Sequence, residues 1–149
     1  MTVKSQGDPM MFRFFTELGI IDQLSKARLE SVLPGDMKMS HFILVHHLER
    51  LGGQWSPARL ANALQVTRAA ITNTVTRLEA QGLVRVDPDP ADGRGKLVSL
   101  TEAGRDMRNE GIRRIAPFMG ELQRQIGEDS FATALPLLEE IRRFLDEHR

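Results

Sequence analysis

The sequence predicts a mainly α-helical protein with a small β-sheet of two to three strands. Apolar residues recur at helical spacing along most of its 149 residues, and proline or glycine marks the ends of the expected helices. Two short β-prone runs, 83–86 and 96–100, flank a loop rich in proline, glycine and aspartate. The length suits one folded unit, 1–149, that includes an oligomerisation element.

Segment 67–82 predicts a helix with two contrasting faces. At about 100° per residue, Ile71, Val75 and Leu78 share one side. The other side has no acid and no bulky apolar residue. It carries Ala69, Thr72, Asn73, Thr76 and Arg77. Short side chains allow close approach to a DNA major groove, where Asn and Thr contact base edges and Arg binds guanine or phosphate. The hydroxyl of Thr67 is expected to cap this helix, and Gly82 to end it.

A shorter helix precedes this one. Ser56 and Pro57 are typical of an N-cap and a first helical position, and the segment 58–64 continues with apolar residues on one side. Gln65 and Val66 then turn the chain. Two helices joined by a short turn form a helix-turn-helix, whose second helix reads DNA.

The two β-prone runs are expected to pair as a hairpin. The loop 87–95 would project as a wing, with Arg94 near its tip, where a lone arginine suits a narrow minor groove. A second interpretation pairs Arg94 with Asp92 within the turn, which would stiffen the wing. The sequence therefore predicts a winged helix-turn-helix over 40–101.

The order and spacing of these segments resemble the MarR family of bacterial transcription regulators. The resemblance is carried by residues 56–61, 66–72, 78–84, 92–94 and 100–105. Gly93 departs from the pattern, because many members have a second basic residue there. That leaves more of the wing's DNA contact to Arg94 and Lys96.

The resemblance also implies control by a small effector, often an aromatic or phenolic acid. Such ligands bind between the dimerisation helices and the reading domain, and they change the distance between the two reading helices. Four residues lie where a pocket of this kind would form, although each also suits ordinary packing. They are His41, Phe42, His46 and Trp55.

Another helix is expected from Ser40, as its cap, to about Leu51, with Gly52 and Gly53 ending it. Its predicted buried positions are Phe42, Leu44, Val45, Leu48 and Leu51. Trp55 follows as a packing residue of the core or of a hinge.

The two ends of the chain have more apolar surface than one small domain can cover. A first helix, with Asp8 as N-cap and Pro9 at its first position, carries Met11, Phe14, Phe15, Leu18 and Ile21. A last helix, about 128–148, carries Phe131, Leu135, Leu138, Ile141 and Leu145. We expect 8–34 and 102–149 to be dimerisation helices, so that a two-fold dimer offers two reading helices to a palindromic site.

Segment 102–125 is predicted to be a long helix that Thr101 caps and that Pro117 bends. Pro136 indicates either a kink in the last helix or two shorter helices, and the sequence leaves both open.

Charge is segregated although the net charge is zero. Segment 55–86 contains four arginines and one glutamate, whereas 121–149 contains seven acids and four bases. The basic part is therefore the reading segment.

Several classes of function lack their residues. Without cysteine there is no disulfide, thiolate metal site or thiol redox sensor. His46 and His47 point about 100° apart on a helix and lack a third ligand, so no metal is expected. The aspartates of 87–92 lack the closing glutamate of a calcium loop. No catalytic constellation is found, and neither an enzyme nor a cofactor is predicted. No leader or membrane-spanning run is recognisable, so a cytoplasmic location is expected.

We therefore predict a homodimeric, sequence-specific DNA-binding regulator, acting as a ligand-responsive repressor on a palindromic operator. The predicted DNA contacts are Ser56, Arg59, Thr67, Arg68, Ala69, Ala70, Thr72, Asn73, Thr76, Arg77, Arg94 and Lys96, with Asp92 supporting the wing. The alternative is a winged-helix module that binds a protein partner without specific DNA binding. A small enzyme or metal sensor is a third hypothesis, for which the convergent ionisable groups are missing.

Overall fold

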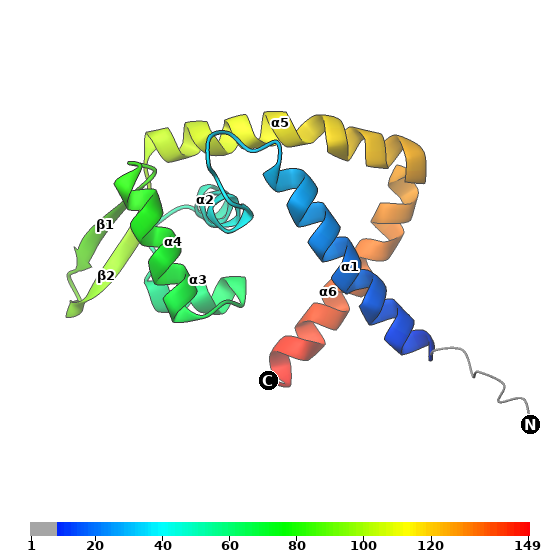
Figure 1. The fold of residues 1–149 in the computed structure, drawn as a ribbon. Helices are drawn as coiled ribbons and strands as arrows, with labels where there is room; N and C mark the ends of the chain where they lie inside the picture. The colour runs from blue at the N-terminus through cyan, green and yellow to red at the C-terminus, as the bar shows by residue number, and fades with distance from the viewer. Residues whose placement is uncertain (1–8) are drawn as a thin grey trace, which may run out of the picture. The chain divides into compact units, whose positions relative to one another are not determined.

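The computed structural model describes residues 9–149 (Figure 1). The chain forms two compact units, one ending at Gly111 and the other spanning Ile112–Arg149. The elements of the first unit, in chain order, are α1 (Met10–Glu30), α2 (Met39–Leu51), α3 (Pro57–Leu64), α4 (Arg68–Ala80), β1 (Val84–Asp89) and β2 (Asp92–Leu100). Helix α5 (Glu102–Ile126) runs from the first unit into the second, which ends with α6 (Glu128–Glu147). The predicted fold class, mainly α with a small β wing, is confirmed.

The core of the first unit lies where α2, α3, α4 and β2 meet. Its most deeply buried side chains are Leu44, Val45, Leu48, Leu60, Leu78 and Val98. These are aliphatic residues at helical or alternating spacing, and burying each contributes about 1.5–3 kcal/mol. The core therefore fixes α4 against the hairpin that follows it.

The helix-turn-helix forms as predicted, and local hydrogen bonds explain why. Ser56 Oγ accepts from the backbone N–H of Arg59 at 3.2 Å, and Pro57 opens α3. Gln65 takes a left-handed conformation with φ of 54°, which ends α3. Thr67 Oγ1 then accepts from the Ala70 N–H at 3.1 Å and caps α4.

The end of α4 depends on Gly82. Its φ of 73° lies in the left-handed region, where a residue without Cβ is least strained. The Leu83 N–H donates to Leu78 O and the Gly82 N–H to Glu79 O, both at 2.9 Å. This paired capping pattern stops the helix and directs the chain into β1.

The hairpin is longer than predicted, and its loop is shorter. Residues Pro90 and Ala91 alone form the turn, so most of the expected loop 87–95 is strand. Arg94 consequently lies within β2 rather than at the tip. The pairing register shifts between Pro88 and Asp89. Because proline cannot donate to the sheet, such a shift is expected beside it. The proline, glycine and aspartate residues that predicted a long loop therefore lie mostly in the strands of a bulged hairpin.

Trp55 supplies a minimal third strand. It forms an isolated antiparallel bridge with Val98 of β2, outside the two-stranded sheet. The expectation of two to three strands corresponds to this arrangement.

The beginning of α2 differs from prediction. Lys38, not Ser40, is the N-cap residue. The N–H of Met39 donates to Glu30 Oε2 at 3.0 Å, and Lys38 Nζ lies 3.3 Å from Glu30 Oε1. A carboxylate from α1 therefore replaces the expected serine cap, and these bonds lower the pKa of Glu30. At the other end of α2, Leu51 is exposed rather than buried.

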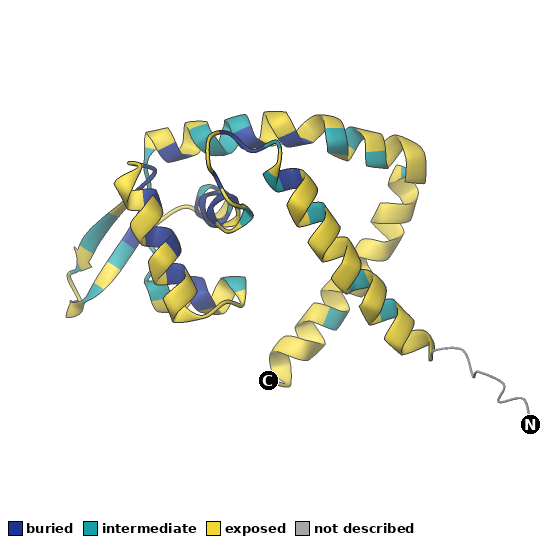
Figure 2. Cartoon of the chain, viewed as in Figure 1, coloured by how far each residue is buried: buried dark blue, intermediate teal, exposed yellow. Residues whose placement is uncertain are grey.

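Helix α1 begins at Met10 with Pro9 as the N-cap residue, one position later than predicted. The predicted cap, Asp8, lies outside the described residues. Only Leu29 of α1 is buried, and the predicted apolar stripe is exposed or partly exposed (Figure 2).

Helix α5 begins at a cap that also joins it to the hairpin. Thr101 Oγ1 accepts from the Gly104 N–H at 3.0 Å and donates to the carbonyl oxygen of Gly82 at 2.6 Å. The predicted Thr101 cap is confirmed. The helix continues through Pro117 to Ile126.

Helix α6 is one continuous helix with Pro136 inside it, so the alternative of two shorter helices is wrong. None of its side chains is buried. Along residues 9–149, no helix combines the length and the apolar composition that crossing a bilayer requires.

Candidate nucleic-acid interface

Helix α4 presents the predicted polar face to solvent. Ile71, Val75 and Leu78 are buried, as expected, and Thr74 joins them. The predicted outer residues Ala69, Ala70, Thr72, Asn73, Thr76 and Arg77 are all exposed, as are Arg68, Glu79 and Ala80. Figure 2 shows the helix dark on its inner side and light on its outer side. The amphipathic pattern alone was sufficient to assign the two faces.

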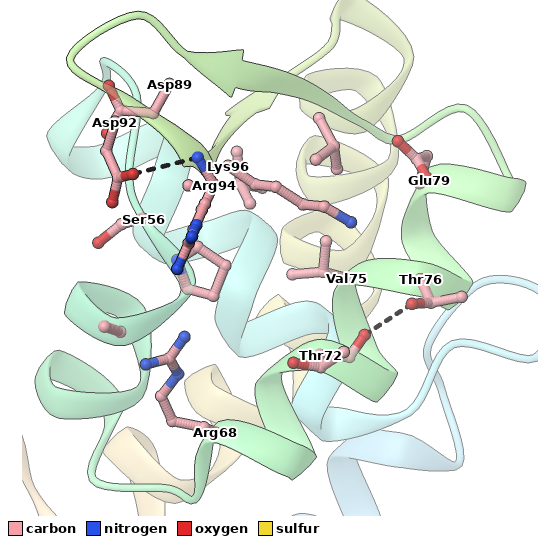
Figure 3. A pocket seen from close by; sticks show the side chains of 15 residues that line it. Ser56, Arg68, Thr72, Val75, Thr76, Glu79, Asp89, Asp92, Arg94 and Lys96 are labelled. Atoms are coloured by element: carbon pink, nitrogen blue, oxygen red, sulfur yellow. Dashed lines mark hydrogen bonds between the residues drawn. The ribbon is translucent and has the colours of Figure 1, made fainter.

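A groove of about 590 Å³ separates α4 from the wing (Figure 3). Its walls are the beginning of α3, the exposed edge of α4 and the inner face of the hairpin. Seven residues predicted as DNA contacts or wing support line it: Ser56, Arg68, Thr72, Thr76, Asp92, Arg94 and Lys96. Arg94 and Arg68 extend into the groove from opposite walls.

Acidic residues share the groove, which the sequence pattern did not predict. Glu79 and Asp89 also line it. Glu79 lies seven residues, or about two helical turns, beyond Thr72 on the edge of α4 that faces the wing, so the exposed surface of α4 is not free of acids. Its spacing from Thr72 could have indicated this position. The groove is therefore not uniformly positive, because acidic side chains lie among Arg68, Arg94 and Lys96.

The wing arginine has a free guanidinium. The backbone N–H of Arg94 donates to Asp92 Oδ1 at 3.1 Å. Across residues 9–149, the Arg94 side chain has neither an ion pair nor a hydrogen bond. Asp92 therefore supports the wing through the backbone, and the side-chain pair considered above does not form. By contrast, Arg85 Nε is bonded to Asp87 Oδ2 at 2.8 Å.

Arg59 is exposed outside this groove, on the first turn of α3. Its Cζ lies 4.3 Å from the centroid of the Trp55 ring, a cation–π distance. The sequence did not predict this contact, because the two residues meet only when the turn before α3 is formed.

Three of the four residues considered for an effector pocket take part in ring contacts, and the fourth, His41, is buried. Phe42 and His46 are stacked, with centroids 5.8 Å apart and planes at 14°. Trp55 instead meets His47 edge-on at 4.7 Å. Arg108 Nε donates to His46 Nδ1 at 3.2 Å.

Burial is the main cause of the lowered pKa values of His41 and His46. It lowers the pKa of His46, with contributions from Arg108 and Arg50. The buried ring of His41 also has a lowered pKa, through desolvation and then the positive charge of Arg77. Both imidazoles are therefore held in their neutral form near pH 7. Among the described residues, no three His, Asp or Glu side chains converge as metal ligands would.

Two helices joined by a tight turn, a polar exposed second helix and an adjoining hairpin with a free arginine define a winged helix-turn-helix protein. The model of the MarR family matches residues 36–95. This match and the solved structures of similar fold confirm the resemblance to the MarR family that the sequence shows.

Known proteins support the assignment from both sequence and structure. The transcriptional repressor NicR of Pseudomonas putida is 46% identical over 52 residues, which are 35% of this chain and 33% of that protein. A mutant of MarR from E. coli, complexed with operator DNA, superposes with a TM-score of 0.78 at 26% identity, covering 88% of this chain and 94% of that one. The regulator BldR from Sulfolobus solfataricus has the same fold, with a TM-score of 0.76 and 24% identity over 92% and 95% of the two chains.

Proposed function

We propose that this protein is a sequence-specific DNA-binding transcriptional repressor. The observation that carries the proposal is the exposed face of α4 beside a groove lined by Arg68, Arg94 and Lys96, none of which has an ion pair within residues 9–149. Asn73 and Thr76 are exposed on this face, where they can approach base edges. Because its partner would be chromosomal DNA, the protein would act in the cytoplasm.

The roles divide by chemistry. Asn73, Thr72 and Thr76 would contact bases, since amides and hydroxyls have donor and acceptor groups that distinguish them. Arg59, Arg94 and the other cations would contact phosphates or the minor groove, where position matters more than sequence. The hydroxyls of Ser56 and Thr67 already serve as helix caps, so their contribution is to orient the first turns toward the backbone.

A homodimer is part of the proposal. Helices α1 and α6 carry exposed apolar residues along their length, and in a monomer these side chains would remain in contact with water. They include Met11, Phe15 and Ile21 in α1, and Phe131, Leu135, Leu138 and Leu145 in α6. A two-fold dimer would bury them and present two reading helices to an inverted repeat.

A response to a small aromatic acid is the finer part of the proposal. The Phe42–His46 stack and the Arg108 guanidinium bonded to it combine aromatic surface with a cation. This combination suits an aromatic carboxylate. We expect benzoate or a hydroxylated benzoate to weaken DNA binding, and we expect Arg108→Ala to reduce that response without changing binding in its absence.

The test is binding to random duplex DNA at two salt concentrations, followed by selection of preferred sites from a random pool. The expected result is a steep salt dependence and an enriched inverted repeat. Asn73→Ala should then relax the preference at particular bases. A flat salt dependence with no enriched site would remove the proposal in favour of a protein-binding module, and equal loss on all sequences for Asn73→Ala would contradict its base-reading role.

A further inference from the structure

Trp55 is held rigidly between the wing and the reading helices. Its backbone pairs with Val98 of β2 through hydrogen bonds of 2.9 and 2.8 Å. Its indole Nε1 donates to the carbonyl oxygen of Gly52 at 2.9 Å. The ring of His47 meets the indole edge-on at 4.7 Å. Because His47 is itself buried, these contacts leave the indole little freedom to move.

The guanidinium of Arg59 lies over this fixed ring, with Cζ 4.3 Å from its centroid. Attraction between a cation and the ring quadrupole favours this position over the many other rotamers of a long side chain. In the part of the chain that the structure describes, the Arg59 side chain has no ion pair and no hydrogen bond. Its N–H donors are therefore available to an oxygen ligand.

The location of Arg59 indicates which ligand that is. The residue belongs to the first turn of α3, and its neighbours Ser56 and Ala58 line the groove between α4 and the wing. A duplex in contact with α4 and the wing would bring a phosphate to this turn. An arginine that is already ordered loses less side-chain entropy when it binds.

We propose that Trp55 is a positioning residue for Arg59, which it holds ready to bind a DNA phosphate. The proposal rests on the DNA-binding function proposed above. In it, Trp55 contributes to DNA binding through Arg59 and does not itself contact a base or a phosphate. It predicts that the two residues act as one unit in DNA binding.

The experiment is a double-mutant cycle on the full chain, with duplex containing the selected site. Arg59→Ala should weaken binding on every sequence and reduce the slope of log affinity against log salt by about one, the effect of one lost phosphate contact. Trp55→Leu should weaken binding about two- to fivefold, which corresponds to an exposed cation–π contact. In the Arg59→Ala background, Trp55→Leu should have no further effect.

A matched cycle with Arg94 separates positioning from general damage to the hairpin. Arg94, in β2, also has no side-chain partner within residues 9–149, and no contact joins it to Trp55 there. We therefore expect the losses from Trp55→Leu and Arg94→Ala to multiply. If Trp55 were only a structural residue, its substitution would weaken binding by the same factor in the Arg59→Ala background, and that result would overturn the proposal.

Two further measurements keep the test decisive. Trp55→Phe retains a ring but has a weaker attraction for a cation. It should therefore give a smaller loss than leucine, again only when Arg59 is present. Trp55 is the only tryptophan, so Arg59→Ala should change the emission spectrum of the DNA-free protein. An unchanged spectrum would show that the contact is absent in solution and would exclude the proposal. Flat salt dependence of the wild-type protein would instead reject DNA binding itself.

Discussion

Two arginines of the wing differ in what surrounds their charge. Arg94 has no side-chain partner in residues 9–149 and extends into the groove, whereas Arg85 is paired with Asp87 at 2.8 Å. A paired arginine must give up its carboxylate before it binds a phosphate. The same residue type in one hairpin should therefore contribute unequally.

We expect Arg94→Ala to weaken DNA binding by about 1–3 kcal/mol on all sequences and to reduce the salt slope by about one. Arg85→Ala removes the same formal charge and is the matched control, with an expected effect below about 0.5 kcal/mol. Fluorescence anisotropy titrations at two salt concentrations measure both. Equal losses would mean that only the total charge of the wing matters.

His47 links stability to pH at the scale of one side chain. Burial lowers its pKa, and the positive charge of Arg50 lowers it further. Its Nε2 is buried and has no hydrogen-bond partner within residues 9–149, so the folded protein favours the neutral ring. The unfolded chain takes up a proton near the ordinary pKa of about 6.5. Stability is therefore fully present above that pH and is lost as the pH falls toward the folded-state pKa.

Urea unfolding at pH 7.5 and 5.5 tests this sign. The wild-type protein should be less stable at pH 5.5, and His47→Leu should lose less stability between the two values. His41 and His46 have pKa shifts in the same direction, so part of the pH dependence should persist in the variant. A variant as pH-dependent as the wild-type protein would contradict the assignment to His47.

At the scale of elements, the first turn of α5 packs too closely against the hairpin for any side chain at Gly104. A Cβ there would lie 2.1 Å from the carbonyl oxygen of Leu83 and 2.6 Å from Leu100 Cδ1. That carbonyl accepts the N–H of Thr101 at 3.2 Å, so moving it would strain the backbone hydrogen bond that joins the start of α5 to the residue before β1.

Gly104→Ala should lower the free energy of unfolding by about 3 kcal/mol. Gly120, in the same helix, is the control because a Cβ there meets only the end of the Arg124 side chain at 3.4 Å. Gly120→Ala should raise stability by up to about 1 kcal/mol through helix propensity. Denaturant titrations at one protomer concentration compare them. A neutral Gly104→Ala would show that α5 does not pack on the hairpin in this way.

The elements also show what local sequence can and cannot predict. Helix α4 was predicted with its correct faces because its apolar spacing and its caps, Thr67 and Gly82, are adjacent in sequence. The predicted extent of the loop 87–95 was wrong, because proline, glycine and aspartate favour a loop and also fit a bulged hairpin, so Arg94 lies in β2. The cap of α2 was wrong because its acceptor, Glu30, comes from another helix.

At the scale of the whole molecule, apolar exposure is concentrated in the first and last helices. Leu135 in α6 and Ile21 in α1 are each more than half exposed, at 54% and 57%. Leu51 is similarly exposed, at 51%, but lies in α2. Exposure by itself does not identify an interface. Substituting these three similarly exposed positions therefore distinguishes a dimer interface in α1 and α6 from ordinary surface in α2.

We expect Leu135→Glu or Ile21→Glu to weaken the dimer at least tenfold, because a charge would be buried in an apolar interface. DNA affinity should fall with it, since one reading helix alone contacts half a site. Leu51→Glu is the control and should leave both unchanged. Sedimentation velocity over a range of concentrations measures the association. A monomeric wild-type protein would contradict this assignment.

The candidate interface was predictable to the extent that it depends on segments adjacent in sequence. Ser56, Thr72 and Arg94 were assigned from motifs of a few residues each. Both acids of the groove were missed. The helical spacing from Thr72 could have placed Glu79 on this edge of α4, but the position of Asp89 depends on how the hairpin faces α4. The Arg59–Trp55 contact was missed for the same kind of reason, since a ring and a cation four residues apart can meet in many ways.

The cap that Glu30 supplies to α2 sets a lower limit on how far this protein can be shortened. The family match begins at residue 36. The N–H of Met39, the first of α2, nevertheless donates to the carboxylate of Glu30, which lies before the match. The buried side chains of Leu29 and Leu33 also precede residue 36. A fragment that started at the boundary of the match would lose about 1 kcal/mol from the missing cap and more from the uncovered core. We therefore expect a fragment that starts within α1, before Leu29, to be more stable than one that starts at residue 36.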